Sequence, residues 1–177
     1  RPGVVVNCCW SLMTLLMHLG SADPDDRIPS HYLSARLPLL LQTLLQTGLG
    51  ASAELGRLRT AAFEAMAGIV GTLPEDQLGL LPQLIGFCLE QPQWEQRPDL
   101  LPQFSALLQA AYRRLGRVEQ PERVLGLVLG RLQQGEAAAE DLLLLLDTLL
   151  PLLEPRLIAS HLSAMLGPLL GGCGQWS

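Results

Sequence analysis

The chain has 177 residues, of which 49% are hydrophobic and 16% are charged, so it can build a folded core and is not a disordered tail. Its formal net charge is −5, and all 12 basic residues are arginine. A net negative surface repels nucleic acid and attracts basic polypeptides. The composition therefore argues against nucleic-acid binding and for a basic protein partner.

Membrane insertion and disulfide bonding are both unexpected. No apolar run reaches the roughly 18 residues that a membrane span requires, and no signal-peptide pattern opens the chain. Two of the four cysteines are adjacent in the sequence, where helical side chains diverge, so we expect reduced thiols at Cys8, Cys9, Cys88 and Cys173. A helical pattern begins soon after Arg1, which indicates a fragment of a longer protein.

Leucine recurs at helical spacing along the whole chain, and Gly, Pro and Asp mark the breaks between the runs. The acidic segment around Asp23 separates the first two runs, and a glycine-rich stretch follows the second. No run has the pattern of a strand, so the sequence predicts an all-α protein. The predicted helices span residues 4–19, 31–47, 57–73, 76–91, 98–116, 119–134, 138–153 and 156–171.

The order of these helices predicts a repeat architecture. If helices work in pairs, the second members begin near residues 4, 57, 98 and 138, and the later starts recur about every 40 residues, the period of HEAT repeats. One such pair cannot bury its apolar faces alone, so neighbouring pairs must stack. We therefore expect one α-solenoid of HEAT-type pairs over residues 1–177, with about three full repeats and a half repeat at each end.

Catalytic and metal-binding patterns are missing from the sequence. His18, His31 and His161 fall in different segments, and none has a His, Cys or carboxylate partner at metal-binding spacing. The sequence has no GxSxG, P-loop or dinucleotide-binding pattern. We expect no enzyme activity, no metal and no cofactor.

The first part of the chain resembles the central region of the importin β family. An Asn-x-Cys-Trp core is followed by an acidic linker, a Tyr-x-Leu helix start and a Leu-Arg-Thr-Ala-Ala-aromatic-Glu-Ala helix. The matching residues are Asn7, Cys9, Trp10, Asp23, Asp25, Asp26, Tyr32, Leu33, Leu58, Arg59, Thr60, Ala61, Ala62, Phe63, Glu64 and Ala65. The resemblance is strong over about residues 4–74. Beyond them the chain is similar to the family in the lengths of its helices more than in the identity of its residues.

This resemblance implies nuclear transport, in the cytoplasm, the nucleus and at the nuclear pore. Family members wrap basic import signals, or the basic adaptor segment of importin α, with stacked HEAT repeats. Ran bound to GTP releases the cargo, mainly through regions that this chain lacks, and phenylalanine-glycine nucleoporins dock between outer helices. The implied position is the middle repeats, and the family motif places Asn7 and Trp10 on the inner face.

Candidate cargo contacts lie on the predicted inner helices, where carboxylates and an aromatic face suit Arg and Lys side chains. They are Asn7, Trp10, Glu64, Asp141 and Asp147. Three of them have an alternative interpretation: Trp10 as packing between repeats, Glu64 as a partner of nearby arginines, and Asp141 as a helix-start carboxylate. Asp147 interrupts an apolar helix and must face water or a cation, because a buried unpaired carboxylate is costly.

Two further residues, Leu84 and Phe87, are weaker candidates for a nucleoporin groove, with core packing as the alternative. Two other functions remain open at the level of sequence. One is a HEAT scaffold for a different protein complex, and the other is a helical accessory domain of an enzyme.

Overall fold

A computed structural model describes residues 2–19, 35–51, 55–90, 98–134, 138–162 and residue 166. These residues form helices connected by turns, with no strand among them, which confirms the all-α class. The chain divides into two compact units, Arg1–Gln83 and Leu84–Ser177. None of the helices in the described ranges is both long and apolar enough to cross a lipid bilayer.

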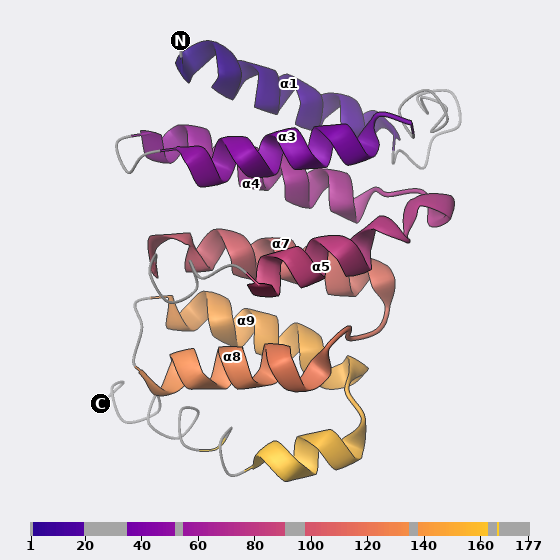
Figure 1. Cartoon of the computed structure of the whole chain (residues 1–177), viewed down its shortest axis with the longest axis vertical. Coiled ribbons are helices and arrows are strands. Elements are labelled where there is room, and N and C mark those ends of the chain that lie inside the picture. The colour runs from indigo at the N-terminus through magenta and orange to yellow at the C-terminus, as the bar shows by residue number, and fades with distance from the viewer. Residues whose placement is uncertain are drawn as a thin grey trace. The chain divides into compact units, whose positions relative to one another are not determined.

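The first unit contains α1 (Pro2–Leu19), α3 (Leu37–Gly50) and α4 (Gly56–Gly71), followed by a 3-10 turn at Glu75–Gln77 (Figure 1). Helix α4 packs against both α1 and α3. It buries Leu58, Ala62, Phe63, Met66 and Val70. Helices α3 and α4 thus form a pair, and α1 stacks on the second member of that pair.

The second unit contains α7 (Leu101–Leu115), α8 (Pro121–Gln133) and α9 (Ala139–Leu149), with α5 (Leu80–Glu90) crossing the boundary between the units (Figure 1). Helix α9 packs against both α7 and α8, so the second unit repeats the stacked-pair arrangement of the first. Short 3-10 turns at Pro98–Leu100 and Leu150–Leu152 flank α7 and α9, and residues 155–162 are helical. The stacked pairs confirm the predicted α-solenoid class.

Prolines set two helix ends differently from the sequence-based ranges. The range 76–91 is wrong at its start, because α5 begins at Leu80 and so keeps Pro82 in its first turn, where a missing N–H costs little. The range 138–153 is wrong at its end, because α9 stops at Leu149 before Pro151 would leave a helical carbonyl unbonded. Residues 31–34 and most of 163–171 in the predicted ranges lie outside the described residues.

Gly48 marks a close approach between α3 and α4. A β-carbon at this position would lie 2.7 Å from Cε2 of the buried Phe63. Replacing glycine by alanine inside a helix normally raises the free energy of unfolding by about 0.5–1 kcal/mol, but overpacking a core lowers it by about 1–3 kcal/mol. We expect Gly48→Ala to lower the free energy of unfolding.

Gly126 in α8 is the matched control for Gly48, because a β-carbon added to Gly126 would have no heavy atom within 4 Å. We expect Gly126→Ala to raise the free energy of unfolding by about 0.5–1 kcal/mol. Denaturant titration of both variants and of the unchanged chain measures whether each substitution raises or lowers the free energy of unfolding. A stabilised Gly48→Ala protein would contradict the close packing of α3 on α4.

Candidate functional site

In each unit the second helices of the pairs lie side by side and form one layer, which the sequence predicts to be the inner one. These helices are α1 and α4 in the first unit, and α7 and α9 in the second. On α4 the exposed residues are spaced by three, four and seven positions, which places them on one strip of the helix: Arg57, Thr60, Glu64 and Gly71. This strip carries one positive and one negative side chain, so it has no net charge.

Helices α1 and α4 run parallel, because an open hollow of about 860 Å³ is lined by the amino-terminal turns of both. Asn7 of α1 and Arg57 of α4 both line it, together with apolar residues such as Leu58. Trp10 and Glu64 lie further along the same two helices and do not line it. The structure thus brings Asn7 together with an arginine that sequence reasoning did not select.

Trp10 is 46% exposed, whereas the neighbouring Cys9 is 4% exposed. Cys9 is therefore the residue of this motif that packs, and nearly half of the Trp10 surface is open to solvent. Burial raises the pKa of the Cys9 thiol, and Cys8 is exposed. Among the described residues, Cys8, Cys9 and Cys88 are all free thiols.

In the second unit the exposed strip of α9 contains both acidic and apolar side chains. Its exposed residues are Glu140, Leu143, Leu144 and Asp147, and Asp141 is half-buried. Asp147 points away from the buried leucines on the opposite side of the helix, so its carboxylate does not carry the cost of burial. The negative charge predicted for the inner layer thus gathers on α9.

Arg113 lies in the last turn of α7. Its Nη2 donates a hydrogen bond of 3.2 Å to Oγ1 of Thr148, and thereby links α7 to α9. The same Thr148 hydroxyl donates to the carbonyl oxygen of Leu144 at 3.0 Å. No sequence pattern indicates a contact between residues so far apart in the chain.

Leu84 and Phe87, the candidates for a nucleoporin groove, lie on α5 in different environments. Leu84 is buried at 8% exposure, and Phe87 is 39% exposed. Phe87 therefore presents surface that a partner can contact, while Leu84 contributes to packing.

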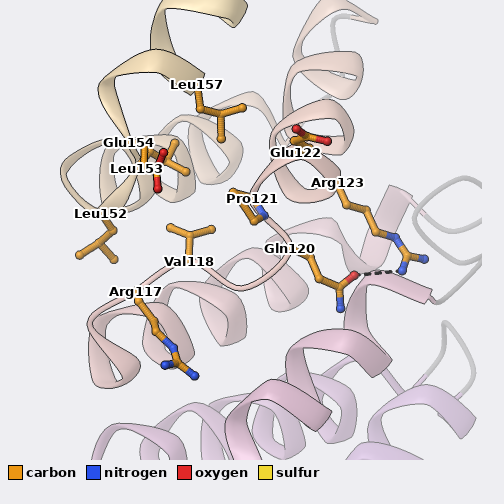
Figure 2. A pocket seen from close by; sticks show the side chains of 10 residues that line it. All are labelled: Arg117, Val118, Gln120, Pro121, Glu122, Arg123, Leu152, Leu153, Glu154 and Leu157. Atoms are coloured by element: carbon orange, nitrogen blue, oxygen red, sulfur yellow. Dashed lines mark hydrogen bonds between the residues drawn. The ribbon is translucent and has the colours of Figure 1, made fainter.

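A second hollow, of about 600 Å³, lies in the second unit at the turns that follow α7 and α9 (Figure 2). Residues from both turns, from the start of α8 and from the helical stretch 155–162 line it. They are Arg117, Val118, Gln120, Pro121, Glu122, Arg123, Leu152, Leu153, Glu154 and Leu157. Sequence reasoning did not find this hollow, because its two turns are more than 30 residues apart.

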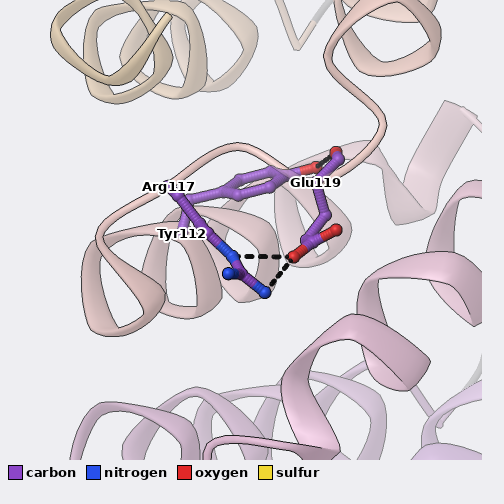
Figure 3. Close-up of polar contacts among 3 residues, drawn as sticks. All are labelled: Tyr112, Arg117 and Glu119. Atoms are coloured by element: carbon purple, nitrogen blue, oxygen red, sulfur yellow. Dashed lines mark hydrogen bonds and ion pairs between the residues drawn. The ribbon is translucent and has the colours of Figure 1, made fainter.

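The turn between α7 and α8 is held by polar contacts (Figure 3). The hydroxyl of Tyr112 donates to the carbonyl oxygen of Glu119 at 3.1 Å, and Nε and Nη2 of Arg117 reach the Glu119 carboxylate at 2.9 and 2.7 Å. Gly116 and Gln120 take left-handed backbone conformations, with φ of 69° and 51°. Burial, aided by nearby Cys88 and Glu119, raises the pKa of Tyr112.

Within the described ranges no group of three His, Cys, Asp or Glu side chains is arranged to hold a metal ion. The predicted site residues are divided between the two units. Asn7, Trp10 and Glu64 lie in the first unit, and Asp141 and Asp147 lie in the second.

Comparison with protein families gives one match, to the model described as importin subunit beta-1-like, TPR repeats, over residues 1–96. Curated proteins and solved structures give no match to the chain. The matched residues cover more than half of the chain and include all of the first unit, so the resemblance seen in the sequence is confirmed. The chain belongs to the importin subunit beta-1-like family of helical repeat proteins.

Proposed function

We propose that this chain is a segment of a nuclear transport receptor that binds basic import signals, or the basic adaptor segment of importin α, on its inner helices. The observation that carries the proposal is the family match over residues 1–96. The proposed location is the cytoplasm, the nucleus and the nuclear pore. Ran-GTP and phenylalanine-glycine nucleoporins are further proposed partners, with Phe87 as a contact for the latter.

The exposed side chains of the inner helices support a basic ligand. Trp10 offers an indole face to an arginine or lysine side chain, and the carboxylates of Glu64 and Asp147 are exposed. Asn7 can bond to the main chain of a ligand, and half-buried Asp141 adds negative charge near Glu140. Exposed charge pairs are weak one by one, so affinity must come from several contacts along the ligand.

Arg113 and Arg57 oppose a basic ligand, because both are exposed cations on the inner helices. We therefore expect the charge of a single helix strip to decide where the ligand binds most tightly. The α9 strip has two exposed carboxylates, and the α4 strip has one carboxylate and one guanidinium.

Binding of a fluorescently labelled adaptor peptide, measured by anisotropy at low salt, tests the proposal. Asp147→Asn and Trp10→Ala should each weaken binding about 1.4- to fivefold, because one exposed ion pair or cation–π contact contributes about 0.2–1 kcal/mol. The two effects should add, since the residues lie in different units and share no partner. Arg113→Gln should strengthen binding about twofold by removing a like charge.

Glu75→Gln is the matched control for these variants. Glu75 is exposed in the 3-10 turn after α4, and its substitution changes the net charge as much as Asp147→Asn does. Equal losses from Glu75→Gln and Asp147→Asn would show a general charge effect and would overturn the assignment of the inner helices. Binding that changes neither with salt nor with these substitutions would favour the alternative function, a HEAT scaffold for a different protein complex.

A further inference from the structure

Exposed residues of α1 and α4 meet at the hollow of about 860 Å³ in the first unit. Four exposed residues of α1 are spaced by four, three and four positions and so share one strip of that helix: Gly3, Asn7, Trp10 and Thr14. The hollow is lined by Gly3 and Asn7 of this strip and by Arg57 of the exposed strip of α4. The two strips therefore open onto one surface of the first unit, and Trp10 and Glu64 lie further along it.

The hollow combines one positive charge with an apolar lining. Among the described residues that line it, Arg57 is the one charged side chain, and no carboxylate accompanies it. Most of the other lining side chains are apolar and come from both helices: Pro2, Val4, Val6, Leu55 and Leu58. Val4 is 56% exposed, so apolar surface is open to a partner in the same hollow as the guanidinium. An apolar side chain next to a carboxylate matches this lining.

Arg57 and Glu64 place a positive and a negative charge along α4 in a fixed order. Both are exposed, and neither forms an ion pair with another residue in the part of the chain that the structure describes. Seven residues separate them, which corresponds to about 10 Å along a helix. An extended peptide advances about 3.3 Å per residue, so ligand groups about three residues apart match the two charges.

We infer that the first unit binds an extended segment in which an acidic residue with an apolar neighbour lies about three residues from a lysine or arginine. The carboxylate of this segment pairs with Arg57, and its apolar side chain enters the hollow against Val4 and Leu58. The lysine or arginine of the segment contacts the Glu64 carboxylate and the indole of Trp10.

This inference rests on the proposed function, because it names the class of segment that the first unit of the receptor selects. The exposed charges of the α9 strip are both negative, whereas those of the α4 strip have opposite signs. A segment with basic residues alone is repelled by Arg57, and a segment that also carries a carboxylate is not. The two units thus differ in the ligand sequence that each prefers.

Titration of the isotope-labelled 177-residue chain with short peptides, followed by amide NMR shifts, tests the inference. The probes carry Leu-Glu-Gly-Gly-Arg, Leu-Gln-Gly-Gly-Arg, Leu-Arg-Gly-Gly-Arg or Ala-Glu-Gly-Gly-Arg between the same glycine and serine ends. We expect the first to bind about two- to fivefold more tightly than the second, which lacks one ion pair, and at least about fivefold more tightly than the third, which brings a like charge to Arg57. The alanine probe should bind at least about threefold more weakly than the first, because less apolar surface leaves water. The shifted amides should include those of Asn7, Arg57 and Leu58.

Arg57→Gln should remove the preference for the Leu-Glu probe over the Leu-Gln probe, and Arg57→Glu should make the Leu-Arg probe the tighter of the charged pair. The matched control is Arg36→Gln, which removes an exposed cation at the start of α3 in the same unit and should leave the preference unchanged.

Three results would overturn the inference. One is equal binding of the Leu-Glu and Leu-Gln probes to the unchanged chain, and another is an equal effect of Arg57→Gln and Arg36→Gln on their ratio. The third is a set of shifted amides confined to α7 or α9, which would place the probe in the second unit. Failure of the proposed function is distinguishable, because it appears as loss of adaptor-peptide binding at low salt, whereas the ratio of these two probes reports only on Arg57.

Discussion

Phe104→Ala is expected to lower the free energy of unfolding by about 3–5 kcal/mol, the usual cost of removing a fully buried phenylalanine side chain. Phe104 lies on α7, which also packs against α9, and its exposed fraction is 0%. Each helix pair depends on its neighbours to cover its apolar face. The cavity left by the Phe104 side chain therefore weakens the packing between neighbouring pairs as well as the packing of α7 itself. Most of the stability of the second unit should be lost.

Phe87→Ala is the control for this substitution, since it removes the same side chain from a position in the same unit that is 39% exposed. We expect its loss to be less than half that of Phe104→Ala, because less surface is returned to water and no closed cavity forms. Urea unfolding followed by circular dichroism gives both values, and hydrogen exchange assigns the loss to the second unit. Equal losses would contradict the buried position of Phe104.

Alkaline pH is expected to destabilise the second unit through Cys88. Complete burial raises the pKa of its thiol from 9.0 to about 12. The folded chain therefore keeps this proton at pH values where the unfolded chain releases it. The contribution of Cys88 is fully present below pH 9 and is lost as the pH rises toward 12, at up to about 1.4 kcal/mol per pH unit.

Tyr112 adds to the same loss above pH 10, its ordinary pKa. Burial raises the pKa of its phenol, and the hydroxyl proton is needed for the hydrogen bond to the carbonyl oxygen of Glu119. The sign is the same as for Cys88, because the neutral form is favoured in the folded chain. Stability should fall more steeply above pH 10 than between pH 9 and pH 10.

Urea unfolding between about pH 8 and pH 11, under a reducing agent, measures this profile. The difference between the unchanged chain and Cys88→Ala isolates one thiol, since Cys9 is present in both proteins. Cys8→Ala is the comparison, because Cys8 is exposed, and we expect it to change the slope less than Cys88→Ala does. A Cys88→Ala profile parallel to that of the unchanged chain would contradict the raised pKa.

Leucine spacing was enough to predict the helical class and the stacked pairs, because burial of one face requires apolar residues every three or four positions. The sequence also predicted that Asp147 faces water or a cation, because burying an unpaired carboxylate is costly, and Asp147 is exposed. Helix ends were less predictable. Pro82 and Pro151 moved two of them, because proline fits only the first turn of a helix.

Contacts between helices could not be predicted in the same way. The hydrogen bond from Arg113 to Thr148 depends on how α7 and α9 are rotated about their axes, which spacing does not define. The hollow at the turns depends on the left-handed Gln120, a conformation that glutamine seldom adopts. Acidic residues that a basic ligand could use were evident from the sequence, whereas the contact of Arg113 with α9 was not.

The most direct test of transport-receptor function is the salt dependence of adaptor-peptide binding to this chain. We predict saturable binding at low salt that weakens progressively as salt is added, because the contacts are exposed charges in a high-dielectric surface. A peptide with its lysines and arginines replaced by glutamine should bind at least about tenfold more weakly at low salt. No binding at low salt, or equal binding of the two peptides, would contradict a receptor role for these helices.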